Sequence, residues 1–299
     1  MKAAAALLLL ATLSFAQEAK RPKITAIDHV DFYTTDAAKN DHLYSELLGL
    51  AHAKPIEPGQ TQRYLVGSSQ WVGYSPAPDT SVKNRMAHVA LTTDDAETMK
   101  KYLAGKGINV PQSLTKWPNG SKSFSVKDPE NYTIEFVQPA KSIAEAEGKS
   151  DPVTQRMIHA GFVVRSREAE NKFYIDTLGF RPYWYGGMKD DKADWVALQV
   201  PEGRDWVEYM LNIKPDADLQ TVGVMNHISL GVPDMKETQA KIESRGWKSN
   251  SREHYQLGRD GKVQLNIYDP DLTRVELMEF KPREKPCCSE FTAPHPDGP

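Results

Sequence analysis

The feature that most constrains the fold of this chain is an internal repeat, in which four similar segments each place a histidine in a short apolar run. The runs are rich in β-branched residues and end in polar or turn residues, so each predicts a strand. They cover residues 26–36, 85–95, 156–166 and 224–234, with His29, His88, His159 and His227 at matching places. Four such segments predict four copies of one structural unit.

Each predicted strand is followed by a helical pattern, in which apolar residues recur three and four positions apart. These patterns cover residues 36–50, 95–108, 167–180 and 234–247, and Gly49, Gly107, Gly179 and Gly246 are expected to close the helices. Further strand-like runs separated by turn signals follow each helix. The predicted unit is therefore one strand, one helix and about three strands.

The last run of each unit is the second place where a polar residue recurs. The four runs are QWVGYS (70–75), YTIEFVQ (132–138), DWVEYML (205–211) and TRVELMEF (273–280). Glu135, Glu208 and Glu276 stand in three of them, whereas Gly73 stands in the first. A single strand glutamate is typical of a solvated edge, and a single strand histidine of a satisfied core residue. Their joint recurrence favours ligands of a divalent metal ion instead.

Strand geometry explains why these positions suit a metal. Side chains alternate across a strand, so Glu135 shares a face with Thr133 and Val137, while Ile134 and Phe136 face the other way. A carboxylate in such an apolar strand is costly to bury without a partner. We therefore expect the glutamates and histidines to converge.

The chain ends and linkers set the domain boundaries. Residues 1–16 have one cation, an apolar run and small residues near Ala16, which is typical of a secretory signal peptide, with a retained N-terminal anchor as the alternative. Linkers are expected at 75–84, 139–152 and 212–223, and the middle one is the longest. We therefore predict a first domain at 24–139, a second at 153–282 and a Pro-rich tail at 283–299, in a periplasmic or secreted protein.

Composition narrows the partners. The formal net charge is −3 and the chain has no basic block, which argues against nucleic acid and against an anionic membrane surface. No stretch after the signal is long and apolar enough to span a membrane. We expect a small-molecule substrate, and a monomer or homodimer.

The two cysteines, Cys287 and Cys288, are neighbours in the tail. Adjacent cysteines can form a ring disulfide, bind a soft metal or link two chains. Because the context is rich in proline and has no hydrophobic period, we favour an accessory tail outside the core.

The layout resembles the vicinal oxygen chelate superfamily, which includes glyoxalase I, extradiol dioxygenases, methylmalonyl-CoA epimerase and the bleomycin and fosfomycin resistance proteins. The resemblance rests on LYSELLGL (43–50) and KFYIDTLGF (172–180), which look like the family's helix end. It also rests on DPENYTIEF (128–136) and DPDLTRVEL (269–277), which look like its Asp-Pro turn and ligand strand. It covers about residues 24–282 and implies an α+β fold of four βαβββ modules, paired into two curved-sheet, glyoxalase-like domains.

The resemblance also implies ligands from the first and last strands of each module. If adjacent modules pair, the second domain has the metal ligands His159, Glu208, His227 and Glu276. The first domain then has a possible second metal site of His29, His88 and Glu135, to which Gly73 adds nothing. If the outer and inner modules pair instead, His88, Glu135, His159 and Glu208 form the complete set. Chain proximity favours adjacent pairing.

Three functions remain open. A two-histidine, two-glutamate site looks like glyoxalase I, in which the metal stabilises an oxyanion and a glutamate moves a proton. We favour this lyase or isomerase chemistry, with Glu208 or Glu276 as the base and Zn, Ni, Co, Mn or Fe(II) as the metal. The alternatives are an Fe(II) extradiol-type dioxygenase acting on an aromatic substrate and a non-catalytic binding or resistance protein.

Details of the fourth module weigh against the oxygenase. Where extradiol dioxygenases carry a histidine and a tyrosine, this sequence has Asp260 and Asn266, although His254 could reach the site from a loop. In the third module, Tyr183, Trp184, Tyr185 and Trp195 either line a pocket or simply pack the sheet.

Overall fold

The computed structural model describes residues 20–79, 81–140, 146–147, 150–251 and 253–298. The predicted signal peptide at residues 1–16 lies outside this part of the chain. Among the described residues, no helix has the length and apolar character needed to cross a membrane.

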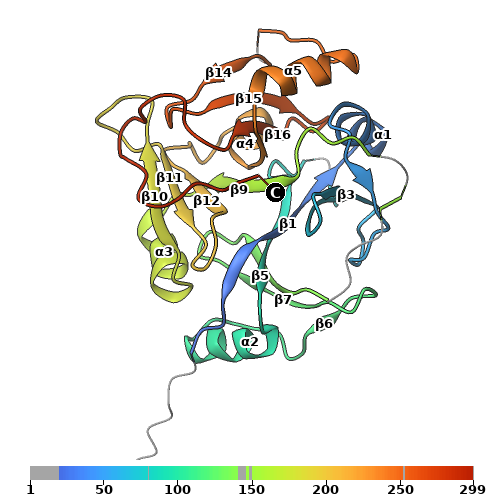
Figure 1. Ribbon diagram of the computed structural model, residues 1–299. Helices are drawn as coiled ribbons and strands as arrows, with labels where there is room; N and C mark the ends of the chain where they lie inside the picture. The colour runs from blue at the N-terminus through green and yellow to red at the C-terminus, as the bar shows by residue number, and fades with distance from the viewer. Residues whose placement is uncertain (1–19, 80, 141–145, 148–149, 252, 299) are drawn as a thin grey trace, which may run out of the picture.

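The two halves of the chain each form one curved sheet of eight strands (Figure 1). The first sheet has the order β2-β3-β4-β1-β5-β8-β7-β6. Its strands are β1 (Ile24–Thr34), β2 (Ala51–His52), β3 (Gln62–Val66), β4 (Gln70–Pro76), β5 (Met86–Thr93), β6 (Thr115–Lys116), β7 (Lys122–Lys127) and β8 (Thr133–Gln138).

The second sheet repeats this order as β10-β11-β12-β9-β13-β16-β15-β14. Its strands are β9 (Arg156–Val163), β10 (Arg181–Gly186), β11 (Trp195–Gln199), β12 (Trp206–Met210), β13 (His227–Val232), β14 (Tyr255–Leu257), β15 (Val263–Tyr268) and β16 (Arg274–Glu279). Each sheet is built from two consecutive modules. The predicted βαβββ fold and the adjacent pairing are therefore confirmed.

One helical segment follows the first strand of every module. In the first and third modules it consists of an α-helical turn and a π-helical turn, namely α1 (Ala37–Asp41) with η1 (His42–Leu47) and α3 (Arg167–Asn171) with η2 (Lys172–Thr177). In the second and fourth it is α2 (Ala96–Gly105) and α5 (Met235–Ser244). The predicted closing glycines, Gly49, Gly107, Gly179 and Gly246, all have positive φ.

The linker expected at 212–223 is partly helical, which differs from the prediction. Helix α4 (Leu219–Met225) begins after Asp218, whose side chain accepts a hydrogen bond from the Thr221 backbone N–H. An aspartate cap is a local helix-start signal, but here it follows other polar residues, so the segment looked like a linker in the sequence.

The core runs through both domains, because one continuous cluster of buried apolar side chains includes strands of both sheets. The Asp-Pro turns support this junction. Asp269 accepts a hydrogen bond from the Tyr74 hydroxyl at 2.9 Å, and Asp128 accepts one from the Tyr174 hydroxyl at 3.3 Å. Each aspartate also accepts backbone N–H groups of its own turn, so the turn motif both shapes a strand entry and joins the halves.

Two candidate metal centres

The four repeated histidines meet in pairs at the centres of the two sheets. Strands β1 and β5 are antiparallel neighbours, and so are β9 and β13. The Nε2 atoms of His29 and His88 lie 2.9 Å apart, and those of His159 and His227 lie 3.0 Å apart. The structure thus brings each pair together in its own domain.

In the second domain, both predicted glutamates reach the histidine pair. Glu276 Oε2 lies 3.3 Å from His159 Nε2, whereas Glu208 Oε2 lies 3.9 Å from His159 Nε2 and 3.6 Å from His227 Nε2. One ligand atom each from His159, Glu208 and His227 lie within 4.8 Å of one another. All four side chains proposed from the sequence therefore converge, with Glu208 the more loosely placed of the two carboxylates.

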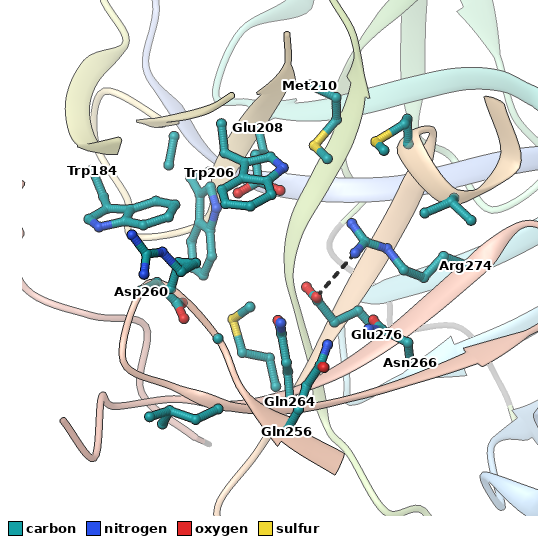
Figure 2. A pocket seen from close by; sticks show the side chains of 18 of the residues that line it. Trp184, Trp206, Glu208, Met210, Gln256, Asp260, Gln264, Asn266, Arg274 and Glu276 are labelled. Atoms are coloured by element: carbon teal, nitrogen blue, oxygen red, sulfur yellow. Dashed lines mark ion pairs between the residues drawn. The ribbon is translucent and has the colours of Figure 1, made fainter. Parts of the chain in front are cut away.

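Arg274 was not anticipated from the sequence. Its guanidinium donates to His227 Nε2 at 2.6 Å. It also lies 3.6 Å from Glu276 Oε1, an ion pair that Figure 2 shows, so it bridges these two residues. Its Nε is buried without a hydrogen-bond partner. A usable signal existed, because Arg274 stands two positions before Glu276 and therefore faces the same side of β16.

These groups set opposite pKa shifts on the two carboxylates. Burial, together with the charge of Glu276, raises the pKa of Glu208 to about 8. Burial would also raise the pKa of Glu276, but Arg274 and His159 outweigh it and hold that pKa at about 2. Burial and Arg274 lower the pKa of His227. Glu276 is thus ionised and His227 neutral, as metal ligands must be.

The second-domain group opens into a cavity of about 400 Å³. Glu208, Glu276 and Arg274 form its polar wall, and Figure 2 shows Glu208 beside Trp206 while Arg274 and Glu276 project from β16. Its apolar wall includes the aromatic side chains Tyr183, Trp184, Trp195, Trp206 and Phe291. The pocket role considered for the third-module aromatics thus holds for three of them, whereas Tyr185 is 43% exposed.

Asp260 and Asn266 also line the cavity, as their sequence positions suggested, and Asn266 of β15 is paired with Glu276 of β16. His254 is exposed and is not among the lining residues. Lys262 is fully buried beside Trp206, with Nζ 4.6 Å from the Trp206 ring centroid and without a hydrogen-bond partner. Burial lowers the pKa of Lys262 to about 8.

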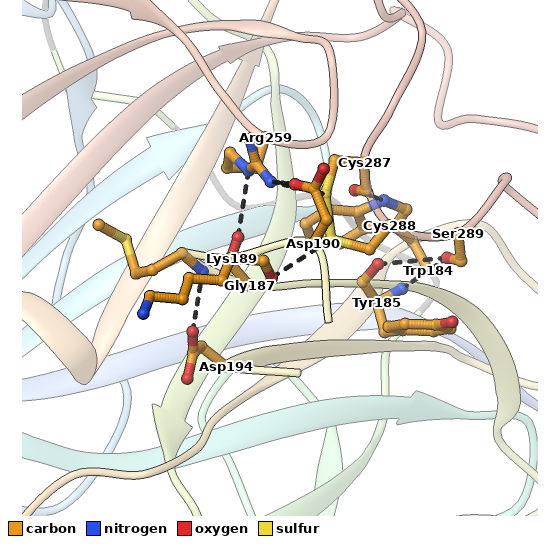
Figure 3. Close-up of a disulfide and its surroundings, with 11 residues drawn as sticks. Trp184, Tyr185, Gly187, Lys189, Asp190, Asp194, Arg259, Cys287, Cys288 and Ser289 are labelled. Atoms are coloured by element: carbon orange, nitrogen blue, oxygen red, sulfur yellow. Dashed lines mark hydrogen bonds and ion pairs between the residues drawn. A yellow bond between two sulfur atoms is a disulfide. The ribbon is translucent and has the colours of Figure 1, made fainter. Parts of the chain in front are cut away.

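The C-terminal tail borders this cavity, so it is not the accessory segment outside the core that we favoured. Cys287 and Cys288 are joined by a disulfide. The Cys287 carbonyl accepts a hydrogen bond from Trp184 Nε1 at 2.9 Å, and the Cys287 N–H donates to the Arg259 carbonyl at 2.8 Å (Figure 3). The tail therefore bridges β10 and the β14–β15 hairpin, and it places Phe291 in the cavity wall.

In the first domain, the predicted His29, His88 and Glu135 also converge. Glu135 Oε2 lies 3.4 Å from the Nε2 atom of each histidine. The structure adds Glu57, whose Oε1 lies 2.7 Å from His29 Nε2 and whose Oε2 lies 3.4 Å from His88 Nε2. Glu57 belongs to the β2–β3 connection, and the repeat contains no signal that could have found it.

Asp31 accounts for the missing glutamate at Gly73. In the second domain Glu208 of β12 pairs with Gly161 of β9, whereas in the first Gly73 of β4 pairs with Asp31 of β1. A Cβ atom at Gly73 would lie 1.8 Å from Asp31 Oδ1. In the first domain the carboxylate therefore comes from the neighbouring strand β1, and the glycine leaves room for it. Asp31, His29, Glu57 and His88 each offer a ligand atom within 4.8 Å of the others.

The two donor sets fit a divalent ion. His29 Nδ1 lies 2.8 Å from Asp28 Oδ1 and His227 Nδ1 lies 2.9 Å from the Met225 carbonyl, so each ring, when neutral, keeps its proton on Nδ1 and presents a lone pair at Nε2. Glu57 Oε1, Glu135 Oε2 and Glu276 Oε2 are buried without a hydrogen-bond partner. Facing lone pairs and orphaned carboxylate oxygens are what a shared cation satisfies. In the second domain, Arg274 must leave His227 for an ion to bind there.

Comparisons with known proteins agree with this architecture. Two family models, both described as the Glyoxalase/Bleomycin resistance protein/Dioxygenase superfamily, match residues 26–136 and 158–265. The structure is similar to homoprotocatechuate 2,3-dioxygenase from Brevibacterium fuscum in complex with 3,4-dihydroxyphenylacetate, with 16% identity, coverage of 91% of this chain and 86% of that chain, and a TM-score of 0.65.

Two further structures are also similar. The enzyme of the same name from Arthrobacter globiformis has 18% identity, coverage of 88% and 82%, and a TM-score of 0.65. A Mn(II)-bound glyoxalase from Novosphingobium aromaticivorans has 16% identity, coverage of 86% and 83%, and a TM-score of 0.63. At these identities the likeness is one of fold.

Proposed function

The chain belongs to the glyoxalase/bleomycin resistance protein/dioxygenase superfamily, and from this premise we propose that its second domain is a metal-dependent catalytic centre for lyase- or isomerase-type proton transfer. The observation that carries the proposal is the convergence of two buried histidines with two carboxylates that line one cavity. His159, His227 and Glu276 would hold a divalent ion, with Glu208 able to complete the set. Such an ion, when bound, acts as a Lewis acid toward substrate oxygen atoms.

Glu208 is assigned the proton transfer because of its position. Its Oε2 is 3.6 Å or more from both histidine nitrogens, whereas Glu276 is closer to His159 and is also held by Arg274. Glu208 also lines the cavity from the strand opposite Glu276. Its Oε2 would take a proton from the substrate carbon next to a carbonyl group and return it to the adjacent atom.

The cavity walls define the kind of substrate. Trp184, Trp195 and Trp206 offer flat apolar surfaces, which bind an apolar or aromatic body and exclude water. Arg274 projects from β16 toward the same space, and once it leaves His227 its guanidinium would pair with a substrate oxyanion or carboxylate. We therefore propose a small anionic carbonyl compound with an apolar part.

The second candidate function is an Fe(II) dioxygenase. It is favoured by the three-ligand arrangement of His159, His227 and Glu276, since two histidines and one carboxylate suit non-haem iron. Against it, the cavity is lined by Asp260 and Asn266 where the resemblance leads us to expect a histidine and a tyrosine. The third candidate is a binding protein without turnover, in which the same cavity would retain its ligand unchanged.

Metal identity and reaction are tested together. The protein is purified anaerobically, its metal is identified, and it is assayed with hemithioacetals of 2-oxoaldehydes, with α-protonated ketones in D₂O and with catechols. Proton exchange or isomerisation without oxygen uptake supports the proposal. Oxygen uptake with the iron-loaded protein supports the dioxygenase, and ligand binding without any turnover supports the binding protein. Either of the last two results refutes the proposed reaction.

Glu208→Gln tests the assigned base. The amide keeps the size of the side chain but cannot accept a proton, so turnover is expected to fall roughly 10²- to 10⁴-fold. The metal content should remain, because Glu208 is the more loosely placed carboxylate and His159, His227 and Glu276 would still hold the ion. Glu237→Gln, at an exposed position of α5, is the matched control and should leave both values unchanged. Full activity of Glu208→Gln would exclude this residue as the base.

We also propose that the protein is exported by cleavage after Ala16, on the evidence of the N-terminal sequence alone. Mass spectrometry of the protein from fractionated cells tests this. An intact N-terminus in the cytoplasmic fraction would contradict it.

A further inference from the structure

We propose that the first domain binds a second divalent metal ion in a closed, structural site formed by His29, His88, Glu57 and Glu135. This ion would tie the β2–β3 connection to the centre of the first sheet. It would be separate from the second-domain centre, and the proposal of this ion does not depend on the reaction proposed there.

The donors already surround one point. Glu57 and Glu135 each approach both histidine Nε2 atoms, at distances from 2.7 to 3.4 Å. His29 Nδ1 is bonded to Asp28, so the neutral ring holds its proton there and offers the Nε2 lone pair to a metal ion. Asp28 in turn accepts from the Thr92 hydroxyl at 3.1 Å, which fixes the orientation of the ring.

Two buried carboxylate oxygens indicate a position for a cation. Glu57 Oε1 and Glu135 Oε2 have no hydrogen-bond partner, although Glu135 is only 7% exposed. Orphaned carboxylate oxygens are costly inside a protein unless a cation meets them. Both belong to the proposed ligand set, so one ion between the histidines would satisfy them together.

The charge balance differs between the domains. In the second domain two cations, the partly buried Arg274 and the fully buried Lys262, already accompany Glu208 and Glu276. In the first domain Asp31, Glu57 and Glu135 are gathered around the histidines, and a buried cation beside them is Arg63, whose guanidinium lies over the Trp71 ring. A dication would offset the remaining negative charge.

The site is closed, which indicates a structural and not a catalytic ion. The His29 side chain is fully buried, and the side chains of Glu57, Glu135 and His88 are 11%, 9% and 14% exposed. The Trp71 ring stacks on His29 with centroids 3.7 Å apart. Four protein ligands on largely buried side chains are typical of structural sites.

Glu57 links this ion to the fold of a long connection. Gln60, from the same connection, donates through Nε2 to both oxygens of Asp31 at 3.2 Å, and its Oε1 accepts from the Ile56 N–H at 3.0 Å. Glu57 and Gln60 thus attach the segment between β2 and β3 to β1. Removal of the ion should loosen this segment first.

The test is metal content and stability of the full-length protein, loaded separately with Zn²⁺ and with Mn²⁺ and freed of excess ion. We expect two ions per chain in the unaltered protein. Glu57→Gln should retain one ion and lower the Tm by on the order of 5 °C, because a ligand that binds only the folded state stabilises it. His88→Gln provides a second variant, and Glu46→Gln, which is exposed on η1, is the matched control.

The second-domain variant Glu276→Gln keeps the two sites apart. It should lose the other ion and leave the first-domain ion in place. The proposal would be overturned if Glu57→Gln and His88→Gln both retain two ions. It would also be overturned if Glu276→Gln binds no ion. Failure of the proposed reaction alone would not change these counts.

Discussion

Replacing Gly73 by glutamate gives the first domain the residue that the second domain has at this place, and the structure predicts that the change fails unless Asp31 is also replaced. A Cβ atom at position 73 would lie 1.8 Å from Asp31 Oδ1 and 2.3 Å from Gln60 Nε2. Asp31 and Gln60 are 2% and 7% exposed, so neither can swing into solvent.

The magnitude follows from two costs. Overpacking a buried site costs about 1–3 kcal/mol. A second carboxylate placed against Asp31 without a new partner adds about 2 kcal/mol. Gly73→Glu should therefore lower the free energy of unfolding by about 4 kcal/mol, and the Tm by roughly 10 °C for a chain of this size.

Asp31→Gly should rescue the variant. The double variant has the arrangement of the second domain, in which Gly161 of β9 faces Glu208 of β12. We expect a coupling energy of about 2 kcal/mol between the two changes, which is typical of residues that compete for one space. Urea denaturation of the four proteins of this double-mutant cycle, without added metal, measures it.

A matched substitution separates this effect from a general cost of glutamate. Gly105 is exposed at the end of α2, and a Cβ atom there meets nothing within 4 Å. Gly105→Glu should change stability by less than about 0.5 kcal/mol. If the effects of Gly73→Glu and Asp31→Gly simply add, the two side chains do not share a space and the reasoning is refuted.

Three other predictions follow from the same structure. Burial and Asp128 raise the pKa of Glu170 from 4.5 to about 8, so between these pH values the folded state holds a proton that the unfolded chain has released. The free energy of unfolding should therefore fall as pH rises through this interval. Glu170→Gln should reduce this pH dependence, as measured by urea denaturation at pH 5 and pH 8.5. Arg274→Met removes the guanidinium that occupies His227 Nε2, so titration calorimetry should show at least about tenfold tighter second-domain metal binding, and unchanged affinity would contradict this competition. Reducing the tail disulfide should leave the tail docked, because the main chain of the tail is hydrogen-bonded to β10. Rapid hydrogen exchange of the Thr292 N–H after reduction would show that the tail has detached.

Much of the fold could be predicted because its determinants are local. The histidines mark first strands, the glutamates mark last strands, and the closing glycines mark helix ends, all at similar spacings. Strand alternation then places each ligand on a definite face, as seen for Glu135, whose neighbours Ile134 and Phe136 lie in the main core. The extra helix α4 escaped prediction because a short polar start resembles a linker.

The candidate sites were predictable only where they follow the repeat. His159, Glu208, His227 and Glu276 were found because each occupies a repeated place. Glu57 was not, because it lies in a connection whose path depends on Gln60 and Asp31. The pocket role of the tail was also missed, since nothing local in a Pro-rich segment indicates which surface it will cover.

The sequence by itself determined the four modules, their order and the strand positions of the ligands, because periodicity and turn chemistry act between neighbouring residues. Only the tertiary structure decided what fills the space beside each histidine pair. There Asp31 takes the place that glycine leaves at position 73, and Arg274 lies against His227. Both depend on distances between strands that are far apart in the chain, and such distances are fixed only when the sheets pack.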